Sequence, residues 1–484
     1  MVARIVVEDN LWARVEGRDN EIDRLTSFRP RGYVFANSYR KGHWDGVIHA
    51  MKRWTGKPSR LPTGLVPYVV QQLPGDIKVE WLPKRPAPLF AWGSSVDLHP
   101  LLPHQVEAVE AAVAATRGII HYPTWTGKSR IIFEIVRSLG VTALVLCDKR
   151  DLWRQLTEEG QKILSEAVVD GAGHMPVLVS TYQTMASHLD PPDEPPKNSS
   201  MTRREWWAHT RQRKQETVEY LKTVDLVICD EAQHCPAATY ELVLRNCPAF
   251  YRFATSATPD KSGEPGDLIR VMAWTGPIIA RMSISEGVDS GRLVPAKVFM
   301  IHPDTVLWAY PDEEPINYKQ EVQAFIVENK RRNNLINRLA GKLRRKGPTL
   351  IIVDRIEHGA NLAYANGCDF AHGGLPKKER ATMFQRFKDG ETTLLVVSKI
   401  ADEGIDLPSI AYLILASGGR APHRQIQRIG RGMRAVEGKD EVLVFDFDDQ
   451  GKYLARHSRR RRRTYEREAA YTVIDIKESE LWLT

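Results

Sequence analysis

The stretch Asp225–His234, DLVICDEAQH, decides the fold, because an apolar run leads directly into two adjacent carboxylates. A run that is apolar almost throughout is typical of a parallel strand covered on both faces. Asp230 and Glu231 would stand at the end of that strand, where one carboxylate can hold Mg²⁺ and the other can act as a general base toward water. The alternative is an acidic pair that caps the following helix.

A candidate phosphate-binding loop precedes this pair by about 100 residues. Residues 118–136, GIIHYPTWTGKSRIIFEIV, have the pattern of a strand, a tight loop and a helix. Backbone N–H groups at the helix start and the Lys128 ammonium would bind the β- and γ-phosphates of ATP, and Ser129 would hold Mg²⁺ together with Asp230. The full glycine pattern is broken, because Tyr122 occupies its first glycine position. The predicted loop consists of Pro123, Thr124, Trp125, Thr126, Gly127, Lys128 and Ser129.

Four regions separate by pattern, and together they predict an α/β protein. Residues 1–97 alternate short β-like runs with turns and end in a proline-rich stretch, which predicts a small α+β accessory domain and a linker. Helical segments alternate with apolar runs over 98–293, with a polar insertion at about 190–222, and the alternation repeats over 294–455. We expect two α/β lobes in tandem, each with a parallel sheet. Residues 456–484 are predicted to form a basic C-terminal tail.

Positive charge is concentrated in two segments of a chain whose formal net charge is +8. Nine Lys and Arg but only one acid, Asp45, lie between Arg24 and Arg60, and seven Arg lie between Arg456 and Arg467. Such clusters suit a phosphate backbone, since each neutralised phosphate releases condensed counterions. The alternative for the second cluster is a solvated tail.

The sequence also predicts where the protein works. No stretch approaches the ~20 apolar residues of a membrane span, and the charged N-terminus lacks the apolar core of a signal peptide. Five scattered cysteines are typical of reduced thiols. We therefore expect a cytoplasmic protein without a membrane partner, located in the host cytoplasm if the chain is phage-encoded.

Six motifs in a fixed order resemble those of superfamily 2 helicases over about residues 98–450. The phosphate loop is one of them, and the Asp230 segment resembles the DEAD/DEAH box. The glutamine motif that reads adenine is resembled by Leu102-Pro103-His104-Gln105. The segment TSATP (255–259) resembles the motif that couples hydrolysis to lobe movement. The second lobe supplies resemblances to motif V, SKIADEGID (398–406), and motif VI, QIQRIGRGMR (425–434).

This resemblance implies two RecA-like lobes that use ATP and Mg²⁺, and it implies a role for each matching residue. Trp125 stands where such helicases usually carry glycine. Arg431 and Arg434 would bring positive charge to the transferred phosphoryl group when the lobes close. The implied catalytic residues are Lys128, Asp230, Glu231, Gln427, Arg431 and Arg434. Nucleotide binding would also involve Gln105, Gly404, Asp406 and Arg428. A nucleic-acid strand would cross both lobes at Lys149, Arg150, Thr181, Gln183, Arg355, His372, Ser398 and Lys399.

The N-terminal region resembles the accessory domain of phage UvsW-type helicases. The segments GHWDG (42–46) and PTGL (62–65) carry this resemblance. Arg40 and Lys41 beside them are candidate phosphate contacts, whereas Trp44 fits a hydrophobic core at least as well as a DNA contact. The tryptophans of the insertion, Trp206 and Trp207, have the same two interpretations, and packing is the more usual one.

The resemblance implies an ATP-dependent DNA helicase or translocase that remodels branched or forked DNA, with RNA–DNA hybrids as further substrates. The expected reactions are branch migration, fork regression and D-loop or R-loop unwinding, in phage replication, recombination or repair. Phage or host recombination proteins are candidate partners. Two alternatives stay open: an RNA helicase with the same motor, and a nucleic-acid clamp whose ATPase is weakened by the departures at Tyr122 and Trp125.

Overall fold

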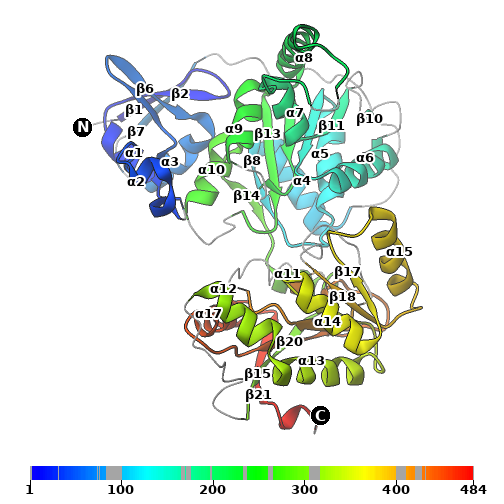
Figure 1. Cartoon of the computed structure of the whole chain (residues 1–484). Helices are drawn as coiled ribbons and strands as arrows, with labels where there is room; N and C mark the ends of the chain where they lie inside the picture. Colours follow the sequence, from blue (N-terminus) through cyan, green and yellow to red (C-terminus); the bar gives the residue numbers. More distant parts are fainter. Residues whose placement is uncertain are drawn as a thin grey trace. The chain divides into compact units, whose positions relative to one another are not determined.

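A computed structural model describes most of the chain, and it divides into two compact units. The first unit comprises Met1–Tyr122 with Gly127–Met282, and the second comprises Pro123–Thr126 with Ser283–Thr484 (Figure 1). The described residues are 3–30, 32–73, 75, 77–82, 101–164, 169–170, 176–196, 199–232, 237–259, 265–304, 317–398, 410–419, 428–430 and 432–482. Within those ranges, no helix is both long and apolar enough to cross a membrane.

Residues 3–82 form a five-stranded sheet in the order β5-β6-β2-β1-β7. The pairing is antiparallel except between β1 and β7, which run parallel. The strands are β1 (Ala3–Val7), β2 (Trp12–Glu16), β5 (Lys52–Trp54), β6 (Lys57–Pro62) and β7 (Ile77–Trp81), with a short antiparallel pair of β3 (Ser27–Phe28) and β4 (Ile48–His49). The helices are α1 (Asp19–Thr26), α2 (Asn37–Arg40) and α3 (Val66–Gln72). The prediction of a small α+β region is confirmed.

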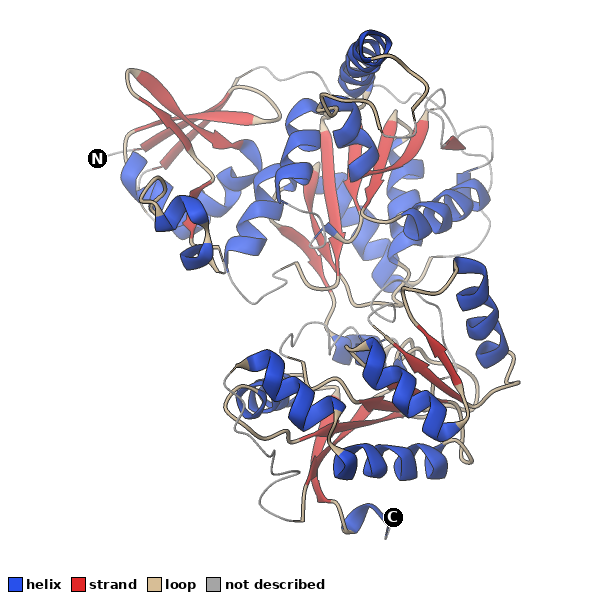
Figure 2. Cartoon of the chain, in the orientation of Figure 1, coloured by secondary structure: helices blue, strands red, loops and turns tan. Residues whose placement is uncertain are grey.

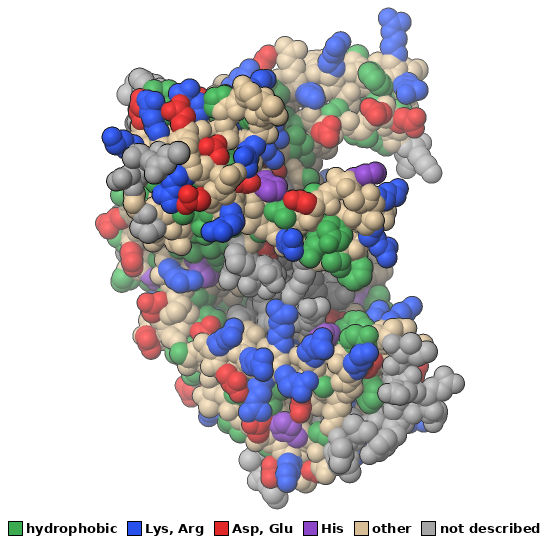
Figure 3. All heavy atoms as spheres, turned by 90° about the vertical axis from the view of Figure 1, so that its left-hand side faces the viewer, with side chains coloured by type: hydrophobic (Ala, Val, Ile, Leu, Met, Phe, Trp, Pro, Cys, Tyr) green, Lys and Arg blue, Asp and Glu red, His purple; other side chains and the backbone are tan. Residues whose placement is uncertain are grey.

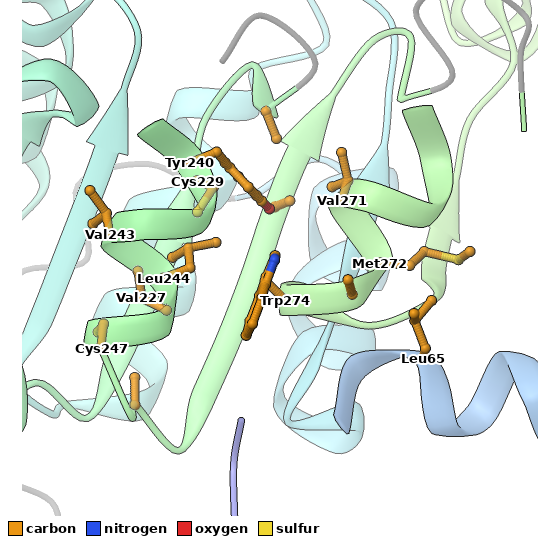
Figure 4. Packing of buried hydrophobic residues seen from close by; sticks show 14 of the residues in the cluster. Leu65, Val227, Cys229, Tyr240, Val243, Leu244, Cys247, Val271, Met272 and Trp274 are labelled. Atoms are coloured by element: carbon orange, nitrogen blue, oxygen red, sulfur yellow. The ribbon is translucent and has the colours of Figure 1, made fainter. Parts of the chain in front are cut away.

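This N-terminal domain packs firmly on α10 (Pro265–Thr275) of the first lobe. The rings of Trp12 and Trp274 meet edge to face with centroids 5.5 Å apart. Leu65 and Met272 belong to one buried cluster (Figure 4), and a Cβ on Gly64 would collide with the Met272 carbonyl oxygen. Such close packing explains why the domain and the first lobe form a single unit. The predicted proline-rich linker lies outside the described residues.

The first lobe has a seven-stranded parallel sheet in the order β10-β11-β9-β12-β13-β8-β14 (Figure 2). Successive side chains bury on opposite faces: Leu144 and Leu146 pack with α7, α9 and α10, whereas Val145 and Cys147 pack with α4, α5 and α6. The strands are β8 (Arg117–His121), β9 (Ala143–Cys147), β10 (Val169–Asp170), β11 (Val177–Thr181), β12 (Leu226–Cys229), β13 (Tyr251–Ser256) and β14 (Ile278–Arg281). The other helices are α4 (Pro103–Ala115), α5 (Lys128–Leu139), α6 (Arg150–Leu164), α7 (Tyr182–Leu189), α8 (Arg203–Thr223) and α9 (Ala237–Asn246).

The second lobe repeats this architecture with the strand order β17-β18-β16-β19-β20-β15-β21, again all parallel. Two tandem α/β lobes are therefore confirmed. The strands are β15 (Ala296–His302), β16 (Thr349–Ile352), β17 (Asp369–Ala371), β18 (Leu394–Val397), β19 (Tyr412–Leu415), β20 (Val442–Phe447) and β21 (Tyr471–Lys477). The helices are α11 (Ile284–Asp289), α12 (Tyr318–Val322), α13 (Lys330–Leu343), α14 (Ile356–Asn366), α15 (Lys377–Lys388) and α17 (Leu454–Glu466).

The end of the chain differs from the predicted basic tail over 456–484. β21 pairs with β15 along seven residues and forms one edge of the second lobe's sheet. α17 carries the arginine run, and its Arg461 is 1% exposed, donating to Asp446 (2.8 and 3.0 Å) and Asp449 (3.1 Å). A buried guanidinium between two carboxylates is a structural element, so Arg461, at the centre of the run, belongs to the core of the second lobe and not to a solvated surface.

The polar insertion contains α8, and its two tryptophans hold the preceding loop. The indole N–H of Trp206 donates to the Pro192 carbonyl and that of Trp207 to the Asp193 carbonyl, each at 3.0 Å. Thr202 and Glu205 form a reciprocal capping box that starts the helix. Both indole N–H groups are thus used to hold the loop, which agrees with the packing interpretation of the tryptophan pair. Trp207 nevertheless remains 55% exposed.

Candidate functional site

The phosphate loop has the expected strand–loop–helix form, and α5 begins at Lys128. Gly127 has φ 81°, and a Cβ there would collide with the Gln105 amide nitrogen. Only glycine combines this backbone conformation with this close approach at low cost. Gln105 itself accepts the Leu102 N–H at 3.1 Å, which fixes it at the start of α4. The predicted adenine-reading glutamine thus lies directly beside the loop.

Tyr122 explains how the loop lacks its first glycine. Its side chain is 1% exposed, and its hydroxyl donates to the His104 carbonyl at 2.9 Å. Its own N–H donates to the Ser256 carbonyl at 3.1 Å. The ring is therefore part of the packing under α4, and the backbone continues into the loop without requiring glycine at this position.

Trp125 and Glu231 share an unusual backbone conformation. Their φ angles are 70° and 46°, in the left-handed region where non-glycine residues cost roughly 1–2 kcal/mol. Trp125 thus adopts the conformation for which glycine is ordinarily used. The remaining loop residues Pro123 and Thr126 are joined by a hydrogen bond from the Thr126 hydroxyl to the Pro123 carbonyl at 2.9 Å.

Asp230 is buried at the end of β12 and is held by its neighbours. The Thr255 hydroxyl and the Glu231 N–H, the latter at 2.9 Å, both donate to its Oδ1. Burial, and secondarily the Glu231 carboxylate, raise the pKa of Asp230, while Lys128 and these hydrogen bonds oppose the rise. Because α9 begins only at Ala237, neither carboxylate is its N-cap.

The predicted catalytic residues of the first lobe lie together. Lys128 Nζ is 3.5 Å from Glu231 Oε1 and 3.4 Å from the Tyr122 carbonyl oxygen. Parallel pairing of β12 with β13 and of β13 with β8 brings the strand ends carrying Asp230, Thr255 and the loop to one edge of the sheet. The sequence signal for Thr255 was its place in the TSATP motif; its hydrogen bond to Asp230 was not foreseen.

The donor set fits Mg²⁺ bound together with nucleotide phosphates. Both hydrogen bonds to Asp230 go to Oδ1, which leaves Oδ2 as an oxygen donor, and Ser129 stands in the first turn of α5. Among the described residues, no group of three or more His, Cys, Asp and Glu side chains could hold a metal alone. Mg²⁺ commonly has one or two protein carboxylates and completes its shell with phosphate and water.

The candidate nucleic-acid residues of the first lobe follow two neighbouring strands. Lys149 and Arg150 come after β9, and Thr181 and Gln183 lie at the end of β11; Cys147 and Thr181 are partners in the β9–β11 ladder. The Thr181 hydroxyl accepts the Thr184 N–H at 3.1 Å and caps α7. These side chains therefore share the edge on which Asp230 also lies, because β9 pairs with β12 as well.

Three candidates of the second lobe are grouped in the same way. Arg355, His372 and Ser398 follow β16, β17 and β18, which are adjacent in the sheet. Arg355 is exposed, whereas Ser398 is 6% exposed. The predicted residues Lys399, Gly404, Asp406, Gln427 and Arg431 lie outside the described residues.

The motif VI arginines have partners that the sequence did not suggest. Arg428 is 2% exposed and donates to the Ser417 hydroxyl (3.1 Å) and to Asp354 (3.0 Å). Asp354 follows the apolar strand β16, and this position after a buried strand was the feature of the sequence that could have identified it as a site residue. Nearby, the Lys439 ammonium donates to the carbonyls of Gly432 and Arg434, and burial lowers the pKa of Lys439 to about 8.

The N-terminal domain presents its predicted basic residues to solvent. Arg40 and Lys41 are exposed at the end of α2. Trp44 is half-buried and donates its indole N–H to the Val47 carbonyl at 2.7 Å, which agrees with a packing role. Phe35, which the sequence did not mark as a site residue, lies just before α2 and is 77% exposed.

Comparison with known proteins places these features in a family. A model described as the helicase conserved C-terminal domain matches residues 330–436, and a model described as the res subunit of type III restriction enzymes matches residues 98–261. The solved structure of the ATP-dependent Type ISP restriction-modification enzyme LlaBIII bound to DNA shares the fold, with a TM-score of 0.56 at 15% identity over 80% of this chain and 32% of that one.

Three relatives cover most of the sequence. The ATP-dependent DNA helicase uvsW of Enterobacteria phage T4 is 22% identical over 487 residues, 90% of this chain and 87% of that protein. The DNA 3'-5' translocase XPB2 of Sulfurisphaera tokodaii is 26% identical over 74% of this chain and 84% of its own length. A Rad25-type protein of Halobacterium salinarum is 28% identical over 76% of this chain, which spans only 58% of that protein. The chain therefore carries a helicase conserved C-terminal domain over residues 330–436, resembles the superfamily 2 helicases, and is similar to phage UvsW over most of its length.

Proposed function

We propose that this protein is an ATP-dependent DNA helicase or translocase that remodels branched DNA. The observation that carries the proposal is the meeting of Lys128, Asp230 and Glu231 at one sheet edge, with 3.5 Å between Lys128 Nζ and Glu231 Oε1. A phosphate loop, a buried carboxylate and an adjacent second carboxylate are the parts that ATP hydrolysis requires.

ATP binding would change the partner of Lys128. Its ammonium, together with N–H groups at the start of α5, would bind the β- and γ-phosphates. Glu231 would then lose its cation and become free to accept a proton from the attacking water. Asp230 and Ser129 would hold Mg²⁺, which when bound neutralises charge on the phosphates. In the second lobe, Arg434 would contribute positive charge to the phosphoryl group.

Nucleic acid would act on this site through neighbouring strand ends. β9 lies between β11 and β12, so Lys149 and Arg150 follow a strand adjacent to the one that ends at Asp230. Thr255 binds Asp230 directly and begins the TSATP segment. A strand bound at Lys149 and Thr181 would therefore influence the position of Asp230 through a short, rigid connection.

The proposal that the substrate is branched DNA depends on the N-terminal domain. That domain is packed on α10, and it carries exposed Arg40, Lys41 and Phe35. One rigid unit thus presents a second basic surface in addition to the sheet edge, which suits a substrate with more than one arm. The names of two relatives, a DNA helicase and a DNA translocase, support DNA over RNA.

A nucleic-acid clamp with a weakened ATPase remains the second candidate, and Trp125 is the observation that favours it. A tryptophan held at φ 70° in the phosphate loop leaves less room for adjustment than glycine would. In that case nucleic acid would bind well but stimulate little ATP turnover.

ATPase measurements separate the two. We expect forks, four-way junctions, D-loops or RNA–DNA hybrids to stimulate turnover by the wild type, and Lys128→Ala to abolish the stimulation while nucleic-acid binding persists. Lys346→Ala, which removes an exposed lysine from the second unit, is the control and should behave as the wild type. Absence of stimulated turnover in the wild type would overturn the motor proposal, and stronger stimulation by RNA than by branched DNA would overturn the choice of DNA.

A further inference from the structure

The N-terminal part of α8 leaves the body of the first lobe. Only Thr217 and Leu221 of this helix are buried, and these lie in its last two turns. Leu221 joins the cluster formed by α7 and α9, whereas residues 203–216 contribute no side chain to a described hydrophobic cluster. The helix is the projection at the top of Figures 1 and 3. A helix that is polar nearly all round needs a reason other than core packing.

Apart from Arg213, which falls at about 280° from Arg203, the charges on this projecting part are sorted by face. With about 100° per residue, Arg203, Arg204, Trp207, Arg211 and Lys214 fall within an arc of about 100°. Glu205 and Glu216 fall on the opposite side, at about 200° and 220° from Arg203. The four cations therefore form one stripe, which we call the α8 stripe, with the exposed Trp207 ring at its centre. Figure 3 shows Lys and Arg side chains along the free side of the projection.

Among the residues that the structure describes, no carboxylate neutralises the α8 stripe. All four of its cationic residues are exposed, and within the described part of the chain no ion pair joins any of them to a carboxylate. Other exposed arginines of this molecule do pair, as Arg4 does with Glu16 at 3.3 Å. Like charges three residues apart on a helix, such as Arg211 and Lys214, repel each other, and a bound anion would relieve that repulsion.

The length of the stripe matches a polyanion. Arg203 and Lys214 are separated by about 16 Å along the helix, at ~1.5 Å per residue. A duplex carries one phosphate per about 3.4 Å along each strand, so a straight row of this length can meet several phosphates. Single strands are held by series of stacking aromatic side chains, whereas the stripe offers only Trp207. The geometry favours a duplex.

We propose that the α8 stripe binds the phosphate backbone of a duplex DNA arm, outside the track that crosses the strand ends. The inference rests on the proposed function, whose substrate has more than one arm, and gives the insertion a task that the motor alone does not need. Trp206 and Trp207 serve it by fixing the preceding loop at Pro192 and Asp193, so that the start of the helix is rigid. Trp207 adds its exposed ring to the contact.

The salt dependence of DNA binding tests this proposal. Affinities of the full chain, without nucleotide, are measured by fluorescence anisotropy for a blunt duplex and for a single strand at 50–300 mM NaCl. We expect R211Q/K214Q to lower the slope of log K against log salt for the duplex by up to about 1.8, and to weaken duplex binding roughly tenfold or more at 0.1 M. The matched control is R345Q/K346Q, which removes two exposed charges after α13 and should keep the wild-type slope.

Two results would overturn the proposal: a duplex slope of R211Q/K214Q equal to that of the wild type, or an equal loss of affinity for the single strand, which would assign the stripe to unpaired DNA. Failure here is distinguishable from failure of the proposed function. The binding slope is measured without ATP, whereas the motor proposal stands or falls with DNA-stimulated ATP turnover by the wild type.

Discussion

Two pairs of carboxylates stand at the ends of apolar parallel strands in this protein. The buried Asp230 and the half-buried Glu231 follow β12, and the buried Asp446 and Asp449 lie at the end of β20. In the second pair, Arg461 and Arg332 supply two cations: Arg461 binds both carboxylates and Arg332 binds Asp449 at 3.0 Å. In the first pair, Lys128 forms an ion pair with Glu231, and its charge opposes the rise in the pKa of Asp230.

The difference separates a structural ion cluster from a site that awaits ligands. Asp446 also accepts the Tyr465 hydroxyl at 2.8 Å, and with Arg461 it ties α17 to the sheet. Its hydrogen-bonding capacity is filled, as a buried charge requires for stability. Among the described residues, both hydrogen bonds to Asp230 go to Oδ1, which leaves Oδ2 for a ligand. An ionised carboxylate in a buried site is costly, and a bound cation with phosphates would offset that cost.

Glu231→Gln is the sharpest test of the first pair. Gln keeps the shape of the side chain but cannot accept the proton of the attacking water, so DNA-stimulated ATP hydrolysis should fall about 10²–10⁴-fold while ATP still binds. Turnover is measured with saturating DNA, and binding with a fluorescent ATP analogue. Hydrolysis within twofold of the wild type would contradict the role of Glu231 as base.

Arg461→Ala tests the second pair. Removing one partner of a buried ion cluster leaves Asp446 and Asp449 poorly compensated, and we expect a loss of about 3–5 kcal/mol in the free energy of unfolding. Arg459→Ala, which removes an exposed arginine of the same helix, should change it by less than about 0.5 kcal/mol. Urea denaturation measures both. Equal changes in the free energy of unfolding would show that Arg461 is no more important to stability than the exposed Arg459.

Changing Asp230 or Asp446 to asparagine should shift the free energy of unfolding in opposite directions. Burial raises the pKa of Asp230 above its unfolded value, so the ionised carboxylate opposes folding at neutral pH. Asp230→Asn should therefore stabilise the nucleotide-free protein at pH 7.5, by about 1–3 kcal/mol, and the gain should shrink as the pH falls through the raised pKa. Asp446→Asn should instead destabilise it, because Arg461 loses one of its two carboxylate partners. The same sign for both changes at pH 7.5 would remove the distinction between the two pairs.

The sequence was sufficient for the fold of both lobes and for the first carboxylate pair. Apolar runs such as ALVLC mark strands buried on two faces, and the order of motifs assigns Lys128, Asp230 and Glu231 to one site. The approach of Lys128 Nζ to Glu231 Oε1, at 3.5 Å, follows from parallel strand ends meeting at one edge of the sheet, which is a property of the fold. Contacts that depend on distant partners, such as Arg428 with Asp354, could not be predicted from local pattern.

The second pair was missed because five consecutive arginines look like a solvated or DNA-binding segment. The signal for burial was nevertheless there. Leu454, Ser458, Arg461 and Tyr465 recur at helical spacing and form the buried face of α17. Tyr471 and Val473 of β21 belong to the same hydrophobic cluster as Tyr465 of this helix. Charge composition describes what a segment can bind, whereas periodicity decides which of its charges reach solvent.

Trp125→Gly addresses the smallest effect, the strain in the phosphate loop. Glycine adopts φ 70° without the penalty of roughly 1–2 kcal/mol that a side chain imposes. If the loop already holds the geometry that phosphate binding requires, DNA-stimulated turnover by Trp125→Gly should stay within about threefold of the wild type. Trp125→Ala, which removes the indole but keeps a Cβ and its strain, is the matched control and separates the backbone effect from the ring.

Turnover that falls more than tenfold in both variants would mean that the indole itself belongs to the nucleotide site. Turnover that rises strongly in Trp125→Gly alone would mean that the tryptophan restrains hydrolysis. That result would support the clamp with a weakened ATPase over the motor. The result expected here is neither. Because the left-handed conformation of the loop is present with tryptophan in place, the missing glycine should limit ATP turnover less than loss of the Glu231 carboxylate does.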